Sequence, residues 1–145
     1  MGTDLPFQPS RVAVERLLAQ SHLPTADLTP ALLQHFLAYG TAEDPAGVVG
    51  LELHGPVALL RSLAVAAHDR GAGLGRRLVA AAEARARLHG VQELCLLTTT
   101  AERFFERLGY ERADREAAPA AIRGTSEFTS LCPASAAFMR KRLDP

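Results

Sequence analysis

The chain has 145 residues, enough for one domain with a hydrophobic core of ordinary size. Sixteen basic residues balance sixteen acidic ones, which argues against binding to nucleic acid or an anionic membrane through bulk charge. No apolar run approaches about 20 residues, and two cysteines fit a reduced cytoplasm better than a disulfide framework. We therefore expect one cytoplasmic domain over residues 1–145, with no nucleic-acid, membrane or metal partner.

Capping residues mark two helices in the first part of the chain. Ser10 is a suitable N-cap for a helix over residues 11–20. Thr29 and Pro30 are typical of the cap and first position of a second helix, which is expected to run to about residue 37. Residues 36–39 could instead begin a strand, and the pattern leaves this boundary open.

A β-hairpin is predicted next. After a polar loop over residues 41–46, residues 47–53 alternate loosely and residues 57–65 form an apolar run. The turn His54-Gly55-Pro56 joins them.

The rest of the chain alternates helices and strands, which predicts a mixed sheet of about six or seven strands with about four flanking helices. Apolar residues at helical spacing favour a long helix that ends near Gly90. The elements expected are a helix over 73–89, a strand over 91–97, a helix over 101–108, a strand over 110–113, a loop with one weak helical turn over 116–125 and a strand over 136–143.

The connection between the 57–65 strand and the long helix is rich in glycine. It reads Arg70-Gly71-Ala72-Gly73-Leu74-Gly75. Glycine lets the backbone bend tightly and approach a ligand, and the start of a helix offers unpaired N–H groups to an anion. A P-loop is excluded because no Gly-Lys-Ser/Thr follows, and a dinucleotide-binding turn would space its glycines differently. A tight turn without a ligand is the remaining alternative.

Two segments carry a family resemblance. The pattern Arg70-x-x-Gly73-x-Gly75, preceded by Leu63-Ala-Val65, resembles the acetyl-CoA signature of the GNAT N-acetyltransferases. The run Phe104-Phe-Glu-Arg-Leu-Gly-Tyr110 resembles the second signature of that family. The resemblance implies the α/β GNAT fold, splayed at the strands on either side of the long helix, with acetyl-CoA as co-substrate.

The resemblance also implies where acetyl-CoA binds. The backbone of Leu63 to Val65 would pair with the pantetheine arm, and the Val65 N–H would face the thioester oxygen as a catalytic donor. The N–H groups of residues 71–76 would hold the pyrophosphate. The cofactor-binding residues expected are Leu63, Ala64, Val65, Arg70, Gly71, Ala72, Gly73, Leu74, Gly75, Arg76, Phe104 and Phe105.

The proton-transfer groups have several candidates. Many GNAT enzymes place a tyrosine at the position of Phe105, where it protonates the leaving thiolate. Here Tyr110 or Thr100 could serve instead, or the thiolate could leave unaided. Glu52 is the candidate general base, with a solvated strand-edge residue as the alternative.

Arg61 interrupts an otherwise apolar strand, and a buried guanidinium needs a partner. Two partners are considered: a substrate carboxylate, held by two parallel hydrogen bonds, or a structural ion pair with Glu52 or Glu102. The substrate-binding residues expected are Arg61, Thr98, Thr99 and Ser135.

A narrower resemblance rests on Leu60-Arg-Ser-Leu63, Leu96-Leu-Thr-Thr-Thr100 and Leu131-Cys-Pro-Ala-Ser135. These runs are similar to the small arsenic-resistance N-acetyltransferases and, more distantly, to the acetyltransferase domain of N-acetylglutamate synthases. They imply an enzyme that acetylates a small amine, such as an amino acid or an amino-acid-like toxin. The sequence leaves open whether the protein is a monomer or a homodimer. A non-catalytic acetyl-CoA sensor and a protein N-acetyltransferase are the alternatives.

Overall fold

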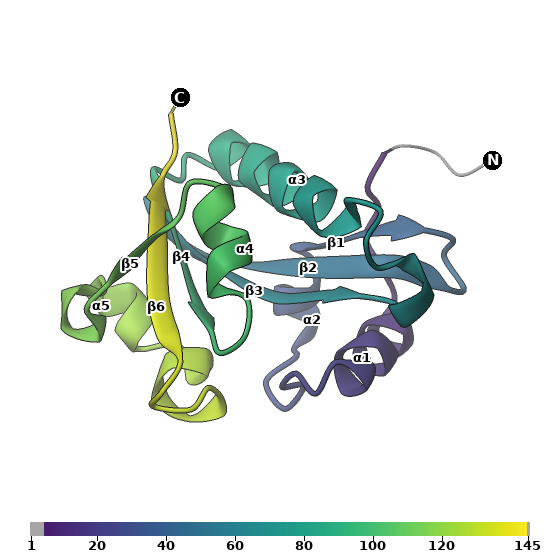
Figure 1. The fold of residues 1–145 in the computed structure, drawn as a ribbon, viewed down its shortest axis with the longest axis horizontal. Coiled ribbons are helices and arrows are strands. Elements are labelled where there is room, and N and C mark those ends of the chain that lie inside the picture. The colour runs from purple at the N-terminus through teal and green to yellow at the C-terminus, as the bar shows by residue number, and fades with distance from the viewer. Residues whose placement is uncertain (1–4, 145) are drawn as a thin grey trace. The chain divides into compact units, whose positions relative to one another are not determined.

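The computed structural model describes residues 5–144 as an α/β structure with a six-stranded mixed sheet (Figure 1). None of the helices in this range is long and apolar enough to cross a membrane. The main elements are α1 (Arg11–Gln20), α2 (Pro30–Leu33), β1 (Phe36–Gly40), β2 (Pro45–His54), β3 (Val57–Val65), α3 (Leu74–Leu88), β4 (Glu93–Thr98), α4 (Glu102–Arg107), β5 (Glu111–Ala113), α5 (Ala120–Arg123) and β6 (Ala137–Arg142).

The strand order in the sheet is β1-β2-β3-β4-β6-β5. β1 and β2 are antiparallel, β3 and β4 are parallel, and β6 is antiparallel to both β4 and β5. The parallel pair runs from Val57 opposite Glu93 to Leu59 opposite Cys95. This confirms the mixed sheet predicted from the sequence, while the splay of its strands stays a prediction.

The chain divides into two compact units, and each is discontinuous in sequence. The first combines Met1–Glu52 with Arg61–Ala84, and the second combines Leu53–Leu60 with Arg85–Pro145. The end of the β2–β3 hairpin therefore belongs to the second unit, although both strands begin or end in the first. The single domain expected over residues 1–145 stays a prediction.

The helix starts of the first unit follow from their capping side chains. The Ser10 hydroxyl accepts a hydrogen bond from the Ala13 N–H at 3.2 Å, and the Thr29 hydroxyl accepts one from the Leu32 N–H at 3.1 Å. Pro30 occupies the first turn of α2, as expected. The second helix is shorter than its longest predicted extent, because Phe36 already belongs to β1.

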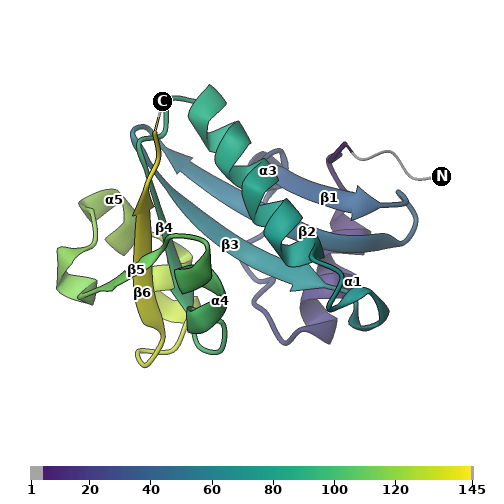
Figure 2. The same ribbon diagram turned by 45° about the horizontal axis from the view of Figure 1, so that its top comes forward.

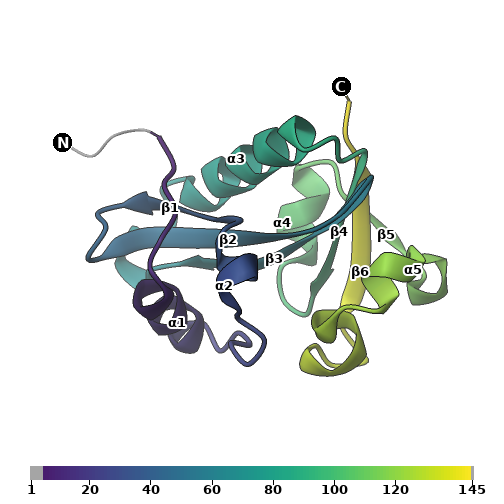
Figure 3. The same cartoon turned by 180° about the vertical axis from the view of Figure 1, so that it is seen from behind.

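The helices of the first unit cover both faces of its strands. Figure 2 shows α3 crossing one face, and the view from behind in Figure 3 shows α1 and α2 on the other. Consecutive residues of β2 serve the two faces: the α-carbon of Gly47 faces Leu78 of α3, while Val48 joins the core cluster that contains Val14 and Leu18 of α1. Pro45 begins β2, so the predicted loop over residues 41–46 is shorter than expected.

Gly50 lies at a position in β2 that has no room for a side chain. A Cβ atom at this position would lie 2.5 Å from the ring of Phe36, which is completely buried. We expect Gly50→Ala to lower the free energy of unfolding by about 1–3 kcal/mol, because the added atom forces the buried ring to shift. Urea denaturation followed by circular dichroism measures this loss. Gly124→Ala is the matched control, since its nearest neighbours lie 3.7 Å from the added atom; an equal loss in both variants would contradict the packing argument.

The second unit packs helices on both faces of β4, β6 and β5, with α4 on one face and α5 on the other (Figures 1 and 3). The α5 side of this unit is a core of Leu59, Cys95, Ala118, Ile122 and Phe138.

A glycine terminates α4 and sets the course of the next strand. Gly109 has a φ of +94° and donates to the Glu106 carbonyl, while the Tyr110 N–H reaches the Phe105 carbonyl. These two bonds form a Schellman motif. The Lys141 ammonium donates to the carbonyl of Leu108 at 2.8 Å and so places a positive charge at the negative end of the helix.

The helical turn predicted within residues 116–125 is confirmed as α5, and the turns on either side of it were not predicted. The sequence suggested a loop with one weak helical turn. The structure has a 3₁₀ turn, Arg115–Ala117, then α5, and then a π-helical turn, Glu127–Leu131. Short turns of this kind have no repeated apolar spacing, so periodicity does not reveal them.

Candidate functional site

The glycine-rich connection lies wholly in the first unit, between the end of β3 and the start of α3. After Val65 the chain forms a 3₁₀ turn, Ala67–Asp69, and then reaches Gly71 and Gly73, whose φ angles are +87° and +80°. A Cβ atom at either glycine would have no neighbour within 4 Å, so the space over both α-carbons is open. The Arg77 N–H then donates to the Gly73 carbonyl, which begins the helical hydrogen bonding. Open backbone at the start of a helix is the geometry that suits a phosphate group.

Three arginines lie in or next to this turn, and they have different surroundings. The Arg70 Nε donates to the Val65 carbonyl at 3.2 Å, which ties the turn back to the end of β3. The Arg77 guanidinium lies 4.4 Å from the centre of the Tyr39 ring and is held there by a cation–π contact. Arg76 is exposed. Arg70 and Arg76 therefore supply the positive charge nearest to the open glycines in sequence.

The end of β3 alternates between core and surface. Ala64 is buried, whereas Leu63 and Val65 are half-buried. Ser62 has a φ of +59°, in the left-handed region that is uncommon for a residue other than glycine. This conformation costs free energy, and such residues cluster at functional positions. The irregularity separates Arg61 from the Leu63–Val65 segment predicted to bind the pantetheine arm.

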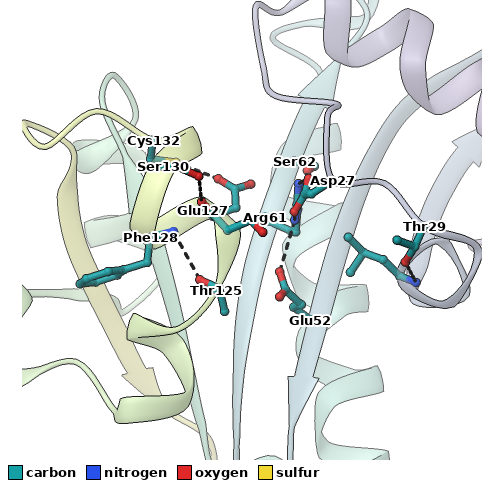
Figure 4. Close-up of polar contacts among 12 residues, drawn as sticks. Asp27, Thr29, Glu52, Arg61, Ser62, Thr125, Glu127, Phe128, Ser130 and Cys132 are labelled. Carbon is teal, nitrogen blue, oxygen red and sulfur yellow. Dashed lines mark hydrogen bonds and ion pairs between the residues drawn. The ribbon is translucent and has the colours of Figure 1, made fainter.

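Arg61 is the centre of a buried ionic network in the first unit. Its Nη1 contacts Asp27 at 2.5 Å and Glu52 at 3.2 Å, and its Nη2 contacts the second Asp27 oxygen at 2.7 Å (Figure 4). Its Nε donates to the Ser62 hydroxyl at 3.0 Å. The Arg61 side chain is 1% exposed. One guanidinium thus holds two carboxylates, with Asp27 in the two-pronged geometry.

The sequence predicted part of this network. Of the two structural partners considered for Arg61, Glu52 is present, whereas Glu102 pairs with Arg112 at 3.4 Å. The main partner, Asp27, was missed. It lies 34 residues away in the loop between α1 and α2, and no spacing pattern links it to β3. The network accounts for the burial of Arg61, and substrate binding by Arg61 stays a prediction.

Phe104 and Phe105 belong to an aromatic cluster in the second unit. The Phe105 ring meets Phe104 edge-on at 5.0 Å between centres and Tyr110 at 5.5 Å, and it is 5% exposed. Tyr110 is almost completely buried. The ring of Phe105 thus packs directly against the phenol that the sequence suggested as a replacement acid.

The predicted substrate residues of the second unit lie at the end of β4 and in the turn before β6. The Thr98 hydroxyl accepts a hydrogen bond from the Ala101 N–H at 3.0 Å, so Thr98 caps this turn. Thr99 is exposed. Ser135 is also exposed, in the turn that leads into β6.

The segment before β6 contains a buried carboxylate that sequence reasoning did not identify. The Cys132 thiol donates to the Glu127 carboxylate at 2.7 Å, and the Cys132 N–H donates to the Glu127 carbonyl (Figure 4). Glu127 is only 6% exposed. Arg115, which precedes this segment in the chain, also holds it, since its guanidinium donates to the carbonyls of Phe128 and Ala136.

The two cysteines do not share a contact that would make them one site. Cys95 lies in the core and approaches Glu93 at 3.7 Å, whereas Cys132 engages Glu127. Burial, with a smaller contribution from the Glu93 charge, raises the pKa of Cys95 to about 12. Over residues 5–144, no group of three or more His, Cys, Asp or Glu side chains is arranged to hold a metal ion.

The raised pKa of Cys95 makes stability fall at alkaline pH. Between its ordinary value of 9.0 and about 12, the unfolded thiol releases its proton while the folded one retains it. The unfolded state then binds fewer protons, so the free energy of unfolding decreases as pH rises, by about 1.4 kcal/mol per unit. Urea denaturation at pH 8 and pH 10 should show a loss about 1.4 kcal/mol greater in the wild type than in Cys95→Ala. Parallel losses in the two proteins would contradict this assignment.

A comparison with protein families now identifies the chain. Residues 33–112, more than half of its length, match the family described as an acetyltransferase (GNAT) domain. The chain belongs to the GNAT acetyltransferase family. The matched range includes β3, the glycine-rich turn, α3 and α4, and thus both signatures recognised in the sequence.

One relative is similar to this GNAT chain in sequence, and two solved structures are similar to it in fold. An uncharacterized N-acetyltransferase of Chlorobaculum tepidum is 42% identical over 66 residues, which are 46% of this chain and 42% of the relative. The Neisseria gonorrhoeae N-acetylglutamate synthase complexed with coenzyme A and N-acetyl-glutamate has a TM-score of 0.76 at 19% identity, over 92% of this chain and 32% of that one. A Mycobacterium tuberculosis protein complexed with coenzyme A has a TM-score of 0.78 at 17% identity, over 97% and 99% of the two chains.

These comparisons confirm the predicted GNAT fold. At sequence identities below 20%, the two solved structures show a similar fold and nothing more. The GNAT chain spans less than half of the Chlorobaculum relative and about a third of the synthase. Both solved structures are complexes with coenzyme A, which agrees with acetyl-CoA as the co-substrate of this family.

Proposed function

We propose that this protein transfers an acetyl group from acetyl-CoA to the amine of a small molecule. The observation that carries the proposal is the turn at Gly71 and Gly73, in which open backbone lies at the start of a 15-residue helix. The family to which the chain belongs supplies the reaction, and the turn supplies a place for the negatively charged pyrophosphate.

Each part of the reaction has a proposed group. The backbone of Leu63 to Val65 aligns the pantetheine arm, and the Val65 N–H donates a hydrogen bond to the thioester oxygen as negative charge develops there. Glu52 accepts a proton from the acceptor ammonium, because an amine attacks only when it is neutral. Arg61 holds Glu52 at 3.2 Å and so limits the positions of its carboxylate.

Departure of the thiolate needs no dedicated acid in this proposal. Phe105 has no proton to donate, and its ring packs against Tyr110. A thiol with an ordinary pKa near 8.5 is a tolerable leaving group.

We propose an acceptor that carries a carboxylate beside its amine, such as an amino acid or an amino-acid-like toxin. Arg61 is the proposed carboxylate partner, with Thr98, Thr99 and Ser135 as further contacts. The Neisseria synthase, which resembles this chain in fold, is complexed with N-acetyl-glutamate.

A link to arsenic resistance rests only on the resemblance of short runs in the sequence. A direct bond between trivalent arsenic and both thiols is disfavoured, because Cys95 is buried and its pKa is raised to about 12. We therefore propose this link only in the form of an arsenic-containing amine that serves as the acceptor. The free thiols of both cysteines also support the proposed cytoplasmic location.

The test is a screen of amines with acetyl-CoA that measures release of free coenzyme A and confirms each product by mass. The panel contains the common amino acids, their decarboxylated amines, phosphinothricin, and peptides with a free N-terminus or lysine. Turnover of an amino acid or phosphinothricin supports the proposal. Turnover of peptides alone would indicate a protein N-acetyltransferase, and binding of acetyl-CoA without turnover of any amine would indicate a sensor.

A further inference from the structure

The guanidinium of Arg61 is almost inaccessible to solvent in the structure. Its side chain is 1% exposed, whereas its partners Asp27 and Glu52 retain 17% and 20% of their side-chain exposure. The guanidinium is thus buried, while the two carboxylates that it holds still reach solvent. An acceptor carboxylate can form a two-pronged contact with Arg61 only by replacing one of them.

The two partners differ in how easily they can be replaced. Glu52 lies within β2, a strand of ten residues whose backbone is fixed by sheet hydrogen bonds. Asp27 lies in the loop between α1 and α2, where the local turn is closed by a long hydrogen bond of 3.3 Å from the Leu28 N–H to Thr25. Loops held by few hydrogen bonds open at lower free energy than strands do. Asp27 is therefore the replaceable partner.

The Asp27 carboxylate contacts Arg61 in the same geometry that a substrate carboxylate would adopt. Its two oxygens accept hydrogen bonds from Nη1 and Nη2 of Arg61, which is the arrangement that an arginine offers to any carboxylate (Figure 4). Exchange of one carboxylate for another leaves the network with the same charges, one positive and two negative. An amine without a carboxylate offers no such replacement.

We propose that Asp27 is an internal stand-in for the acceptor carboxylate and sets the selectivity for amines that carry one. This rests on the proposed function, with Arg61 as the carboxylate partner. An incoming carboxylate displaces Asp27 from Arg61, while Glu52 remains paired. Because Asp27 competes with the acceptor for Arg61, it raises the KM of carboxylate-bearing acceptors only.

The first experiment needs no turnover. In Asp27→Ala the stand-in is gone, so acetate ions should bind Arg61 and raise the melting midpoint as their concentration increases at constant ionic strength. The wild type and the control Asp44→Ala, which changes an exposed aspartate of the same unit, should respond much less. An equal response of all three proteins, or none, would overturn the proposal. If Asp27→Ala does not fold, Asp27→Asn takes its place, since the amide keeps the shape but has no negative charge and accepts through one oxygen instead of two.

The second experiment compares KM values for acceptors matched with amines that lack a carboxylate, L-glutamate with propylamine and L-leucine with 3-methylbutylamine. In Asp27→Asn, the KM for the amino acid that is turned over should fall about tenfold, because the competing bond is weaker by about 1.4 kcal/mol. For leucine, the KM of the paired amine should stay the same. A purely structural role would instead shift both KM values together, or the KM for acetyl-CoA, and would overturn the proposal. Lack of turnover with every amine would contradict the proposed function, while the acetate experiment would still decide the role of Asp27.

Discussion

Gly73→Val should lower the affinity for acetyl-CoA at least about a hundredfold, equivalent to about 2.7 kcal/mol, with the fold retained. At a φ of +80° a β-branched side chain is strained, and the turn relieves that strain only by leaving its present conformation. The new side chain would also extend into the open space over Gly73, where the pyrophosphate is proposed to bind. Isothermal titration with acetyl-CoA measures the change.

The matched control is Gly55→Val, in the turn between β2 and β3. Gly55 also has a positive φ, +70°, and no neighbour within 4 Å of an added Cβ atom. This variant carries a similar backbone strain and should therefore lose similar stability, while it retains its affinity for acetyl-CoA. Unchanged affinity in a folded Gly73→Val protein would remove the coenzyme from this turn.

Arg61→Ala should lower the free energy of unfolding by about 3 kcal/mol. The substitution leaves two partly buried carboxylates, Asp27 and Glu52, without their shared cation, and uncompensated charge in such a place is costly. Urea denaturation at neutral pH measures the loss. Arg61→Lys should recover only part of it, because an ammonium cannot reproduce the two parallel hydrogen bonds to Asp27.

Arg112→Ala is the control for an ordinary ion pair. Arg112 contacts Glu102 at 3.4 Å, but its side chain is 65% exposed, and such pairs contribute at most about 1 kcal/mol. If Arg61→Ala cost no more than Arg112→Ala, the buried network would not be a source of stability. In a folded Arg61 variant, the KM for a carboxylate-bearing acceptor should also rise more than the KM for acetyl-CoA.

The parts of the fold that sequence predicts well are those with a local chemical signal. Ser10 and Thr29 mark helix starts because their hydroxyls bond to backbone N–H groups only three residues away. Gly90 has a φ of +78° just after α3, as expected for a helix end. The glycine-rich turn was found for the same reason, since its glycines and their positive φ angles lie in one short segment.

The parts that sequence does not predict depend on distant contacts. Arg61 was singled out because a charged residue in an apolar strand needs a partner, yet nothing in the sequence names Asp27, 34 residues away. The pair formed by Glu127 and Cys132 depends on a π-helical turn, which has no periodic pattern to recognise. Local chemistry therefore predicts where an unusual residue lies, and the folded chain decides what it contacts.

The discontinuous division of the chain has a consequence for the order of its folding during synthesis. Residues up to Ala84 contain everything that the first unit needs, so that unit can assemble before residues 85–145 leave the ribosome. The hairpin tip, Leu53–Leu60, is made early but belongs to the later unit, and its edge at Val57–Leu59 waits for β4 to emerge. A nascent chain stalled before Glu93 would thus present an unpaired strand edge, the kind of surface that recruits chaperones or a second nascent chain.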